Sequence, residues 1–398
     1  MTQICKEVVK IAEIKNNQEF IPFSSPLIQQ EEIDAVVKCL QSGWIGTGPI
    51  VAEFEKNFAD FKGVQDAAAV NSCTAAIQLS LIASDIKNDD EVITTAMTFC
   101  STVNAIINVG ATPILIDVDS QTQNINVQLI EEKITSKTRA IIVVHFAGQV
   151  CEMDEVLSLA KKYNLKVIED CAHAIESSYN GKPAGTLGDF GCFSFYSTKN
   201  ITTVEGGMVV AKQKKDLDKI RVLSLHGMDK DAWSRYSNFG YKHYDVIFSG
   251  FKYNLTDVQA SIGIEQLKKI DNFYSIRTKI WDYYQNELTN CPVTLPIYKK
   301  NLLNVHSHHL FTIQIDENYK NVDRDDFIFK MKEKGIGVGV HYKSIPSFSY
   351  YRSRFNWKSE NWPISKKIGN TTVSLPLSPK LCHKDTERIV EAVKKILI

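Results

Sequence analysis

Residues 193–207 read FSFYSTKNITTVEGG, and this stretch joins a strand pattern to an isolated lysine. In Phe193–Tyr196 apolar and polar side chains alternate, which is typical of a half-buried strand. Lys199 follows that run, and the stretch ends at Gly206-Gly207. A strand that ends beside an amine predicts a place where a reactive group is held. The alternative is that Lys199 is a solvated surface residue, as most lysines are.

Around this stretch, strand patterns and helix patterns alternate between residues 60 and 215. Buried strands are predicted at residues 66–70, 91–94, 114–118, 140–145 and 165–169. Apolar residues at helical spacing occupy residues 75–84, 101–109 and 153–163, and residues 212–219 (KQKKDLDK) read as the solvated start of a helix. Strands that alternate with helices favour an α/β fold with a mainly parallel sheet, covered by helices on both faces.

The pattern changes after Gly250 to that of a smaller α+β region. Helices are predicted at residues 257–269, onward to about 288, and at 325–335 and 385–397, with strands at 308–315 and 336–342. We therefore predict an N-terminal extension (1–20), a large sheet domain (21–265) and a small C-terminal domain (266–398). The extension has the pattern of a short amphipathic helix or a frayed end.

The composition is that of an ordinary soluble globular protein, with 44% hydrophobic and 23% charged residues. Lys plus Arg and Asp plus Glu each number 46, and this balance argues against a protein that binds nucleic acid through bulk positive potential. No apolar run approaches the ~18–20 residues of a membrane span, and the N-terminus lacks the features of a signal peptide. The nine cysteines form no C-x-x-C pair, so we expect reduced thiols and a cytoplasmic location.

Polar side chains fall where predicted strands end, and ligands of open α/β sheets bind beyond the carboxyl ends of strands. Residues 71–74 (NSCT) precede a predicted helix, so their hydroxyl and N–H groups suit a phosphate ester, although the local pattern by itself favours an ordinary helix cap. Asp170 ends a strand in VIEDCAHA, where a carboxylate either caps a helix or pairs with a buried cation. His173 then supports that carboxylate, covers a bound ring, or is a structural histidine.

These residues together supply what pyridoxal phosphate (PLP) needs from a protein. The cofactor requires a phosphate site, a carboxylate beside its ring nitrogen and a lysine that forms an imine. A free lysine has a pKa of ~10.4, so Lys199 needs partial burial or cationic neighbours to release its proton. Ser194, five residues before Lys199, is a further candidate for a phosphate contact.

At these motifs the chain resembles the DegT-like nucleotide-sugar aminotransferases, which are PLP enzymes of the aspartate-aminotransferase fold (fold type I). The resemblance covers roughly Ile21 to the C-terminus. It rests on these segments, in chain order: IPFSSPLIQQEEIDAVVKCLQSGWIGTGP, EVITTAMTFCSTVNAI, GATPILIDVDSQTQNI, VIEDCAHAIESSYNGKPAGTLGDFGCFSFYSTKNITTVEGG, SGFKYNLTDVQASIGIEQLKKID and KGIGVGVHY.

The resemblance implies a large PLP domain with a seven-stranded type of sheet and specific roles for single residues. Lys199 would hold PLP through an imine and then move protons, Asp170 would pair with the pyridine nitrogen, and His173 would sit beside the cofactor. Further cofactor contacts are implied for Phe99 on the ring face and, at the phosphate, for Ser72, the backbone of Cys73 and Ser194. Asn254 would reach the phosphate of a partner subunit, which implies a homodimer with shared active sites. Weaker candidates on the substrate side are Trp44, Arg235 and His341.

The implied reaction moves an amino group from L-glutamate to a 4-keto nucleotide sugar. The segments LSLHGMDKDAW, GFKYNLTD and HYKSIPSFSYYRSRF resemble the branch that aminates carbon 4 of UDP-linked sugars for surface polysaccharides or glycoconjugates. Amination at carbon 3 and a dTDP- or GDP-linked substrate stay open as alternatives. Cys73 and Val204 depart from the common pattern, in which the first position is glycine or alanine and the second is glycine.

Three other classes of protein compete with this interpretation. A PLP-dependent sugar dehydratase shares the fold, but such relatives carry histidine in place of Lys199. A regulatory protein that has lost catalysis is the second. A dinucleotide-binding enzyme is the third, and we reject it because no G-x-G-x-x-G motif follows a strand. We expect no metal site, because the histidines at 306, 308 and 309 lack a spaced carboxylate or cysteine partner and fit a strand edge better.

Overall fold

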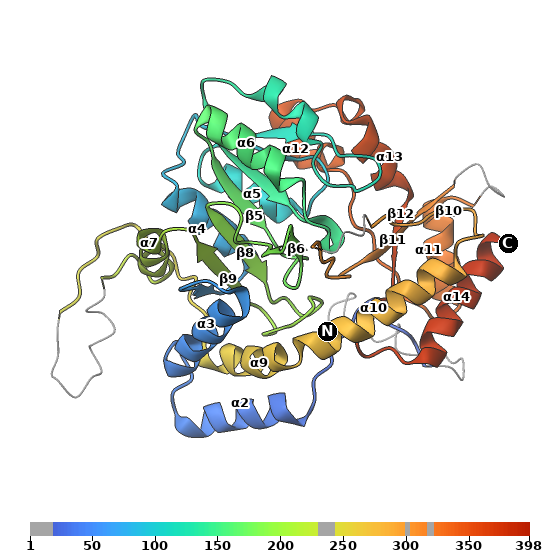
Figure 1. The fold of residues 1–398 in the computed structure, drawn as a ribbon, viewed down its shortest axis with the longest axis horizontal. Coiled ribbons are helices and arrows are strands. Elements are labelled where there is room, and N and C mark those ends of the chain that lie inside the picture. Colours follow the sequence, from blue (N-terminus) through green and yellow to red (C-terminus); the bar gives the residue numbers. More distant parts are fainter. Residues whose placement is uncertain (1–18, 230–242, 299–302, 317–321) are drawn as a thin grey trace, which may run out of the picture.

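The structure is a computed structural model that describes residues 19–229, 243–298, 303–316 and 322–398. The predicted N-terminal extension therefore lies almost entirely outside the described residues. Figure 1 shows a large sheet region and a smaller region around β10, β11 and β12, with the long helix α10 running between them.

The large region is built on a seven-stranded sheet with the order β1-β9-β8-β5-β4-β2-β3 (Figure 1). β2, β3, β4, β5 and β8 pair in parallel, while β9 is antiparallel to both β8 and β1. The strands span Ala68–Val70 (β1), Glu91–Thr95 (β2), Thr112–Ile116 (β3), Thr138–Val144 (β4), Lys166–Asp170 (β5), Phe190–Ser194 (β8) and Gly207–Ala211 (β9). The prediction of a mainly parallel sheet is confirmed.

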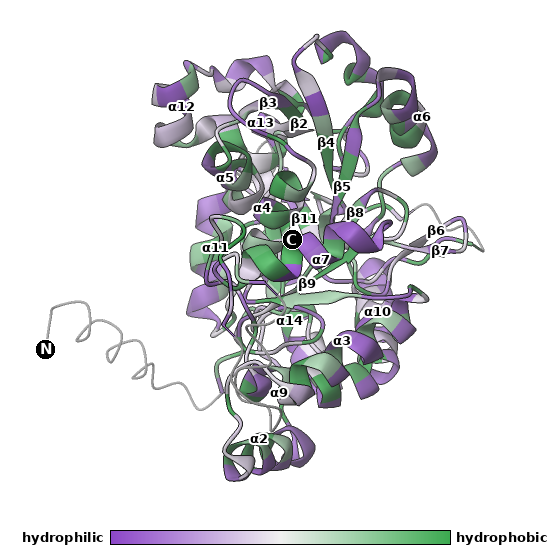
Figure 2. Ribbon diagram, turned by 90° about the vertical axis from the view of Figure 1, so that its left-hand side faces the viewer, coloured by the Kyte–Doolittle hydropathy of each residue, from purple (hydrophilic) through white to green (hydrophobic). Residues whose placement is uncertain are grey.

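Alternating side chains along the buried strands pack against helices on both faces of this sheet. In β4, Ala140 and Ile142 contact the cluster of α4, whereas Ile141 and Val143 contact that of α6. Figure 2 shows that α3 and α6 carry hydrophilic as well as hydrophobic residues. The helices of this region are α2 (Gln30–Ser42), α3 (Pro49–Lys62), α4 (Cys73–Ala83), α5 (Cys100–Asn108), α6 (Met153–Tyr163), α7 (Lys214–Ser224) and α9 (Asp257–Lys268).

The smaller region has its own hydrophobic cluster around a three-stranded antiparallel sheet. That sheet has the order β10-β11-β12, and residues such as Tyr284, Phe311 and Ile389 form its core. Its elements are α10 (Ile270–Glu287), β10 (Val293–Thr294), β11 (Phe311–Ile315), α11 (Arg324–Glu333), β12 (Thr372–Leu375) and α14 (His383–Leu397). The predicted boundary near residue 265 falls inside α9 and stays a prediction.

Two helices after β11 leave the smaller region and pack on the edge of the large sheet. They are α12 (Ser349–Phe355) and α13 (Pro363–Thr371). Ile345 and Tyr351 join a cluster with Ala96, Val103 and Leu115. The segment before α12, residues 336–342, begins in the smaller region, and its last residue, Tyr342, contacts Phe99 and His173 beside the carboxyl ends of the large sheet. None of the helices in the described residues has the length and apolar content needed to cross a membrane.

One strand prediction is wrong, and several strands were not predicted. Residues 336–342 make only isolated bridges, Ile336 with Ile21 and Gly339 with Ser374, because Gly337 and Gly339 offer no side chain to pack and lie close to Phe23. β9 was missed because the glycine pair at 206–207 was interpreted as a break. β10, β12 and the hairpin β6 (Ser178–Tyr179) and β7 (Lys182–Pro183) are too short to give a clear pattern.

Candidate active site

A cavity of about 500 Å³ lies where β5 and β8 end and where α4 and α5 begin. One wall comes from these elements of the large sheet, and the other comes from His341 and Tyr342 in the segment before α12. Eight of the predicted site residues line the cavity: Ser72, Cys73, Phe99, Asp170, His173, Ser194, Lys199 and His341. Residues that lie far apart in the sequence therefore meet in one place.

The first turn of α4 presents hydrogen-bond donors to this cavity. Ser72 is the N-cap, and its Oγ accepts a hydrogen bond of 3.1 Å from the N–H of Ala75. The N–H groups of Cys73 and Thr74 have no acceptor among the described residues, as is usual in a first helical turn. Gly207 lets β9 pass beneath this turn, because a Cβ there would lie 2.5 Å from the carbonyl carbon of Ser72. The helix start is thus both capped and able to bind an anion.

Asp170 is a buried carboxylate at the end of β5. Its Oδ1 accepts a hydrogen bond of 3.1 Å from the N–H of Ala172, and its Oδ2 accepts one of 2.9 Å from the Thr102 hydroxyl. Burial raises the pKa of Asp170, although these hydrogen bonds and the charge of Lys199 oppose the rise. A cation placed against this carboxylate would therefore be stabilised strongly.

Lys199 lies in the turn that follows β8, not on the strand. Its backbone N–H donates to the carbonyl of Tyr196 at 2.9 Å, and β8 has already ended at Ser194. Its Nζ makes no hydrogen bond or ion pair with a described residue. Burial lowers the pKa of Lys199 to about 8, and the nearby Cys73 and Asp170 only partly offset that effect. The result is a free amine with a neutral fraction near physiological pH.

The two histidines of the cavity are held by neutral partners. His173 contacts the N–H of Ala147 through Nδ1 at 3.2 Å and the Tyr342 hydroxyl through Nε2 at 3.0 Å. It therefore does not hydrogen bond to Asp170, which was one of its three predicted roles. His341 Nδ1 lies 2.8 Å from the Ser374 hydroxyl, and burial lowers the pKa of His341 to about 3. Both rings are uncharged at neutral pH, since burial also lowers the pKa of His173 well below its usual value.

Comparison with known proteins agrees with this arrangement. Residues 26–394 match the model of the DegT/DnrJ/EryC1/StrS aminotransferase family. The chain is 42% identical over 387 residues to the spore coat polysaccharide biosynthesis protein SpsC of Bacillus subtilis, covering 96% of this chain and 99% of SpsC. The chain belongs to this family.

Solved structures extend the likeness to the whole fold. The putative sugar aminotransferase Spr1654 of Streptococcus pneumoniae, in its PMP form, superposes with a TM-score of 0.86 at 32% identity, covering 95% of this chain and 97% of that chain. Helicobacter pylori PseC, an aminotransferase involved in the biosynthesis of pseudoaminic acid, gives 0.87 at 28% identity, covering 96% and 99%. The fold is that of the type I PLP aminotransferases, and the predicted enzyme class is confirmed.

The DegT-family chain has PLP as its cofactor, and the residues of the cavity fit that molecule. Spr1654 has also been solved in a PLP form. Three features match three parts of PLP: unpaired N–H groups at the start of α4 suit the phosphate, the buried Asp170 suits a protonated ring nitrogen, and the free Nζ of Lys199 suits the aldehyde. The predicted cofactor is confirmed.

Two predicted residues that the structure describes do not line the cavity. Trp44 is 47% exposed, and its Nε1–H donates to the carbonyl of Thr47 at 3.1 Å. Asn254 Nδ2 donates to the Thr47 hydroxyl at 2.5 Å. Arg235 lies outside the described residues. The roles of Trp44 and Asn254 stay predictions, and a role of Asn254 in a second subunit is compatible with its position outside this cavity.

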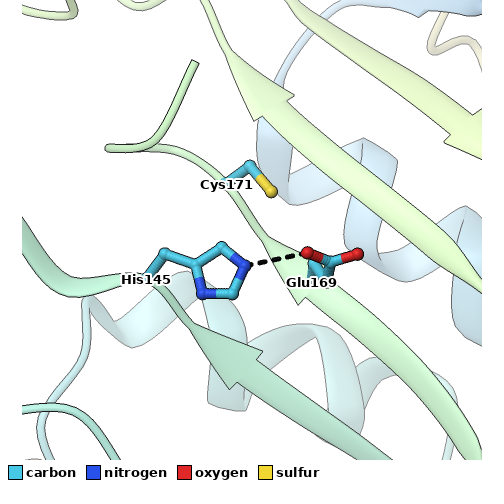
Figure 3. Close-up of side chains that lie close together, drawn as sticks. All are labelled: His145, Glu169 and Cys171. Carbon is cyan, nitrogen blue, oxygen red and sulfur yellow. Dashed lines mark hydrogen bonds and ion pairs between the residues drawn. The ribbon is translucent and has the colours of Figure 1, made fainter. Parts of the chain in front are cut away.

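A buried cluster of His145, Glu169 and Cys171 lies next to Asp170, and Figure 3 shows the His145 ring pointing at the carboxylate. Glu169 accepts hydrogen bonds from the N–H groups of Gly185, Leu187 and Gly188 and from His145 Nε2 at 2.9 Å. His145 Nδ1 in turn accepts from the N–H of Cys151. Since these lone pairs are occupied, the cluster ties the ends of β4 and β5 together and does not suit a metal ion.

Sequence reasoning missed Thr102 and Tyr342. Thr102 lies one helical turn after Phe99, so the spacing could have predicted that its hydroxyl faces the same site. Tyr342 follows His341, but nothing in KGIGVGVHY indicates that its hydroxyl meets His173, which is 169 residues away in the chain. The histidines at 306, 308 and 309 are buried just before β11. His306 and His308 lie near the ring of Trp281, whereas the ring of His309 lies 4.4 Å from that of His173.

Proposed function

We propose that this protein transfers an amino group from L-glutamate to the 4-keto group of a nucleotide-linked hexose. We propose UDP as the nucleotide and a 4-amino sugar for a surface polysaccharide or glycoconjugate as the product. The family supports amino transfer, and the name of the relative SpsC supports a polysaccharide pathway. The resemblance of residues 250–257 and 341–355 to the branch that aminates carbon 4 supports the finer assignment.

The observation that carries the proposal is the state of Lys199. A lysine in water is almost wholly protonated at neutral pH, whereas burial lowers the pKa of Lys199 to about 8. Roughly a tenth of its amine is then neutral at pH 7, enough to react with a carbonyl group and to accept a proton. No described carboxylate pairs with Nζ and holds the proton in place.

The other residues of the cavity would bind and orient the cofactor. PLP, when bound, supplies an electron-withdrawing ring that lets a proton leave the carbon beside the amino group. Asp170 would hold the positive charge of the ring nitrogen, and the start of α4 with Ser194 would hold the phosphate. Phe99, 57% exposed at the cavity, would cover one ring face. The Nζ of Lys199 would take a proton from the amino donor and return one to the sugar carbon.

Substrate contacts and assembly complete the proposal. His341 lines the cavity and is our substrate-side candidate there, with Trp44 and Arg235 as further candidates. We propose a homodimer in which Asn254 serves the phosphate of the other subunit. We also propose a cytoplasmic location, which the unpaired state of the described cysteines supports.

Two measurements test the function in sequence. Purified protein with PLP is first mixed with L-glutamate, and we expect the cofactor absorbance to change as 2-oxoglutarate accumulates. The loaded protein is then given a panel of UDP-, dTDP- and GDP-linked 4-keto and 3-keto hexoses, and the products are identified by mass spectrometry. An amine at carbon 4 of a UDP sugar is the expected result.

Each other result of these two measurements would identify one of the alternative functions. An amine at carbon 3, or on a dTDP- or GDP-linked sugar, corrects the substrate and keeps the reaction. Loss of water from the sugar without 2-oxoglutarate identifies a dehydratase. A protein that gives neither reaction, while Lys199 still takes up PLP, is a binding or regulatory member of the family.

A further inference from the structure

The Tyr342 hydroxyl is a polar group of the cavity to which the proposed chemistry assigns no part. Its ring is held by aromatic neighbours, with centroid distances of 4.9 Å to His341, 6.0 Å to Phe99 and 6.1 Å to Phe146. Tyr342 also lines the cavity itself. Its hydroxyl therefore has a fixed position beside whatever the cavity binds.

His173 fixes the direction of the hydrogen bond between the two side chains. A backbone N–H can only donate, so the contact of Ala147 N–H with Nδ1 leaves that ring nitrogen without a proton. His173 is neutral, because burial and the charge of Lys199 lower its pKa. A neutral imidazole whose Nδ1 accepts must carry its proton on Nε2. Nε2–H therefore donates to the Tyr342 oxygen, 3.0 Å away.

The hydroxyl proton of Tyr342 is consequently free for another acceptor. No described residue accepts it, whereas two buried tyrosines do have acceptors: Tyr351 donates to Asn104 Oδ1 at 2.7 Å and Tyr284 to the carbonyl of Pro376 at 2.9 Å. Burial and the nearby Asp170 raise the pKa of Tyr342, so its proton stays on the oxygen. Because Tyr342 lines the cavity, an oxygen atom of a bound molecule can accept this proton.

We propose that Tyr342, oriented by His173, is a fixed hydrogen-bond donor to an oxygen atom of the molecule bound in the cavity. Tyr342 is then a binding residue and His173 a positioning residue that acts through it. The acceptor oxygen belongs either to the ring of PLP or to the sugar, and both sources present the same chemistry. The inference rests on the proposed function only for the second source, because the cofactor is established for this family.

The central experiment replaces Tyr342 by phenylalanine, which keeps the ring and removes the hydroxyl. The dissociation constant of PLP and the pH titration of its absorbance are measured without substrate, and KM and kcat are measured with the keto sugar that the wild type accepts. If the acceptor is an oxygen of the PLP ring, Y342F should shift the pH titration of the PLP absorbance and bind PLP roughly five- to tenfold more weakly. If the acceptor is an oxygen of the sugar, Y342F should leave that titration unchanged and raise the KM for the sugar by roughly the same factor.

Tyr351→Phe is the matched control, since it removes a buried tyrosine hydroxyl of the following helix, α12, that does not line the cavity. We expect it to leave both readouts unchanged. If Y342F also leaves both unchanged, the inference is overturned. A wild type that accepts no sugar of the panel refutes the proposed function alone, and an unchanged PLP titration in Y342F then refutes this inference too.

His173 variants test the orientation. In His173→Gln the amide can accept from Ala147 and donate to Tyr342, so we expect most of the binding to be retained. His173→Leu cannot orient the hydroxyl, so the loss caused by Y342F should largely disappear in the His173→Leu background. Losses that multiply in the double variant would mean that His173 acts independently of Tyr342, and would overturn its positioning role.

Discussion

The two walls of the cavity differ in charge and in origin. The wall formed by β5, β8 and α4 carries Asp170 and Lys199, whose ionisation the protein shifts toward neutrality. The wall formed by residues 341–342 carries groups that stay uncharged, since His341 has a pKa of about 3 and Tyr342 keeps its proton. The first wall, which we call the charged wall, is suited to moving protons. The second, which we call the neutral wall, is suited to recognising shape and oxygen atoms. This contrast can be tested by changing one wall at a time.

The largest effect should follow the loss of the reactive amine. We expect Lys199→Ala to lower kcat at least about 10³-fold, because both proton transfers and the covalent attachment depend on this group. Borohydride treatment of the wild type should leave a pyridoxyl mass on the peptide that contains Lys199, and the variant should lack it.

Lys394→Ala is the control for that variant. Lys394 forms a surface ion pair with Glu287 at 2.7 Å in the smaller region, so its loss should leave kcat unchanged. A pyridoxyl adduct on any other lysine of the wild type would show that the charged wall has been placed wrongly.

The pH dependence of PLP uptake separates the two walls directly. Lys199 reacts only as the neutral amine, and its pKa is lowered to about 8, so the uptake rate of the apoprotein should be half-maximal near pH 8 and level off about one pH unit above it. Between pH 6.5 and 8 this corresponds to a rise of roughly fifteenfold. The neutral wall should add no step in this range, because His341 loses its proton near pH 3. Stopped-flow absorbance measures the rate, and a rise that continues through pH 10 would mean that Lys199 titrates like a solvated lysine.

The same contrast explains what the sequence could and could not predict. The charged wall consists of residues beside the ends of strands, so the local pattern around VIED and FSFYSTK was enough to place Asp170 and Lys199 together. The neutral wall depends on a contact between His173 and Tyr342 across 169 residues, and on glycines that make residues 336–342 an irregular segment. Local periodicity carries no information on such a contact, and it led us to predict a strand there.

A smaller effect on activity is expected from Thr102, which supports the charged wall and was not among the predicted site residues. Thr102→Val keeps the shape of the side chain but removes the hydrogen bond to Asp170 Oδ2. We expect kcat/KM to fall roughly five- to tenfold, because the carboxylate loses one of the donors that stabilise its charge. The matched control is Thr94→Val, which removes a buried threonine hydrogen bond to the carbonyl of Ile142, away from the cavity lining. Equal losses of kcat/KM in the two variants would indicate a general effect on packing.

The smallest effect concerns the loop that follows Lys199. Val204 has a φ of 71°, in the left-handed region that is unfavourable for a β-branched residue. Its side chain is 57% exposed. Glycine adopts this conformation without strain, so Val204→Gly should raise the free energy of unfolding by about 1 kcal/mol in denaturant titrations. Val246→Gly, at an equally exposed valine without positive φ, should lower it instead. The two variants must therefore differ in sign, since the strain is specific to position 204. If both destabilise, the left-handed loop is supported by contacts that valine itself makes.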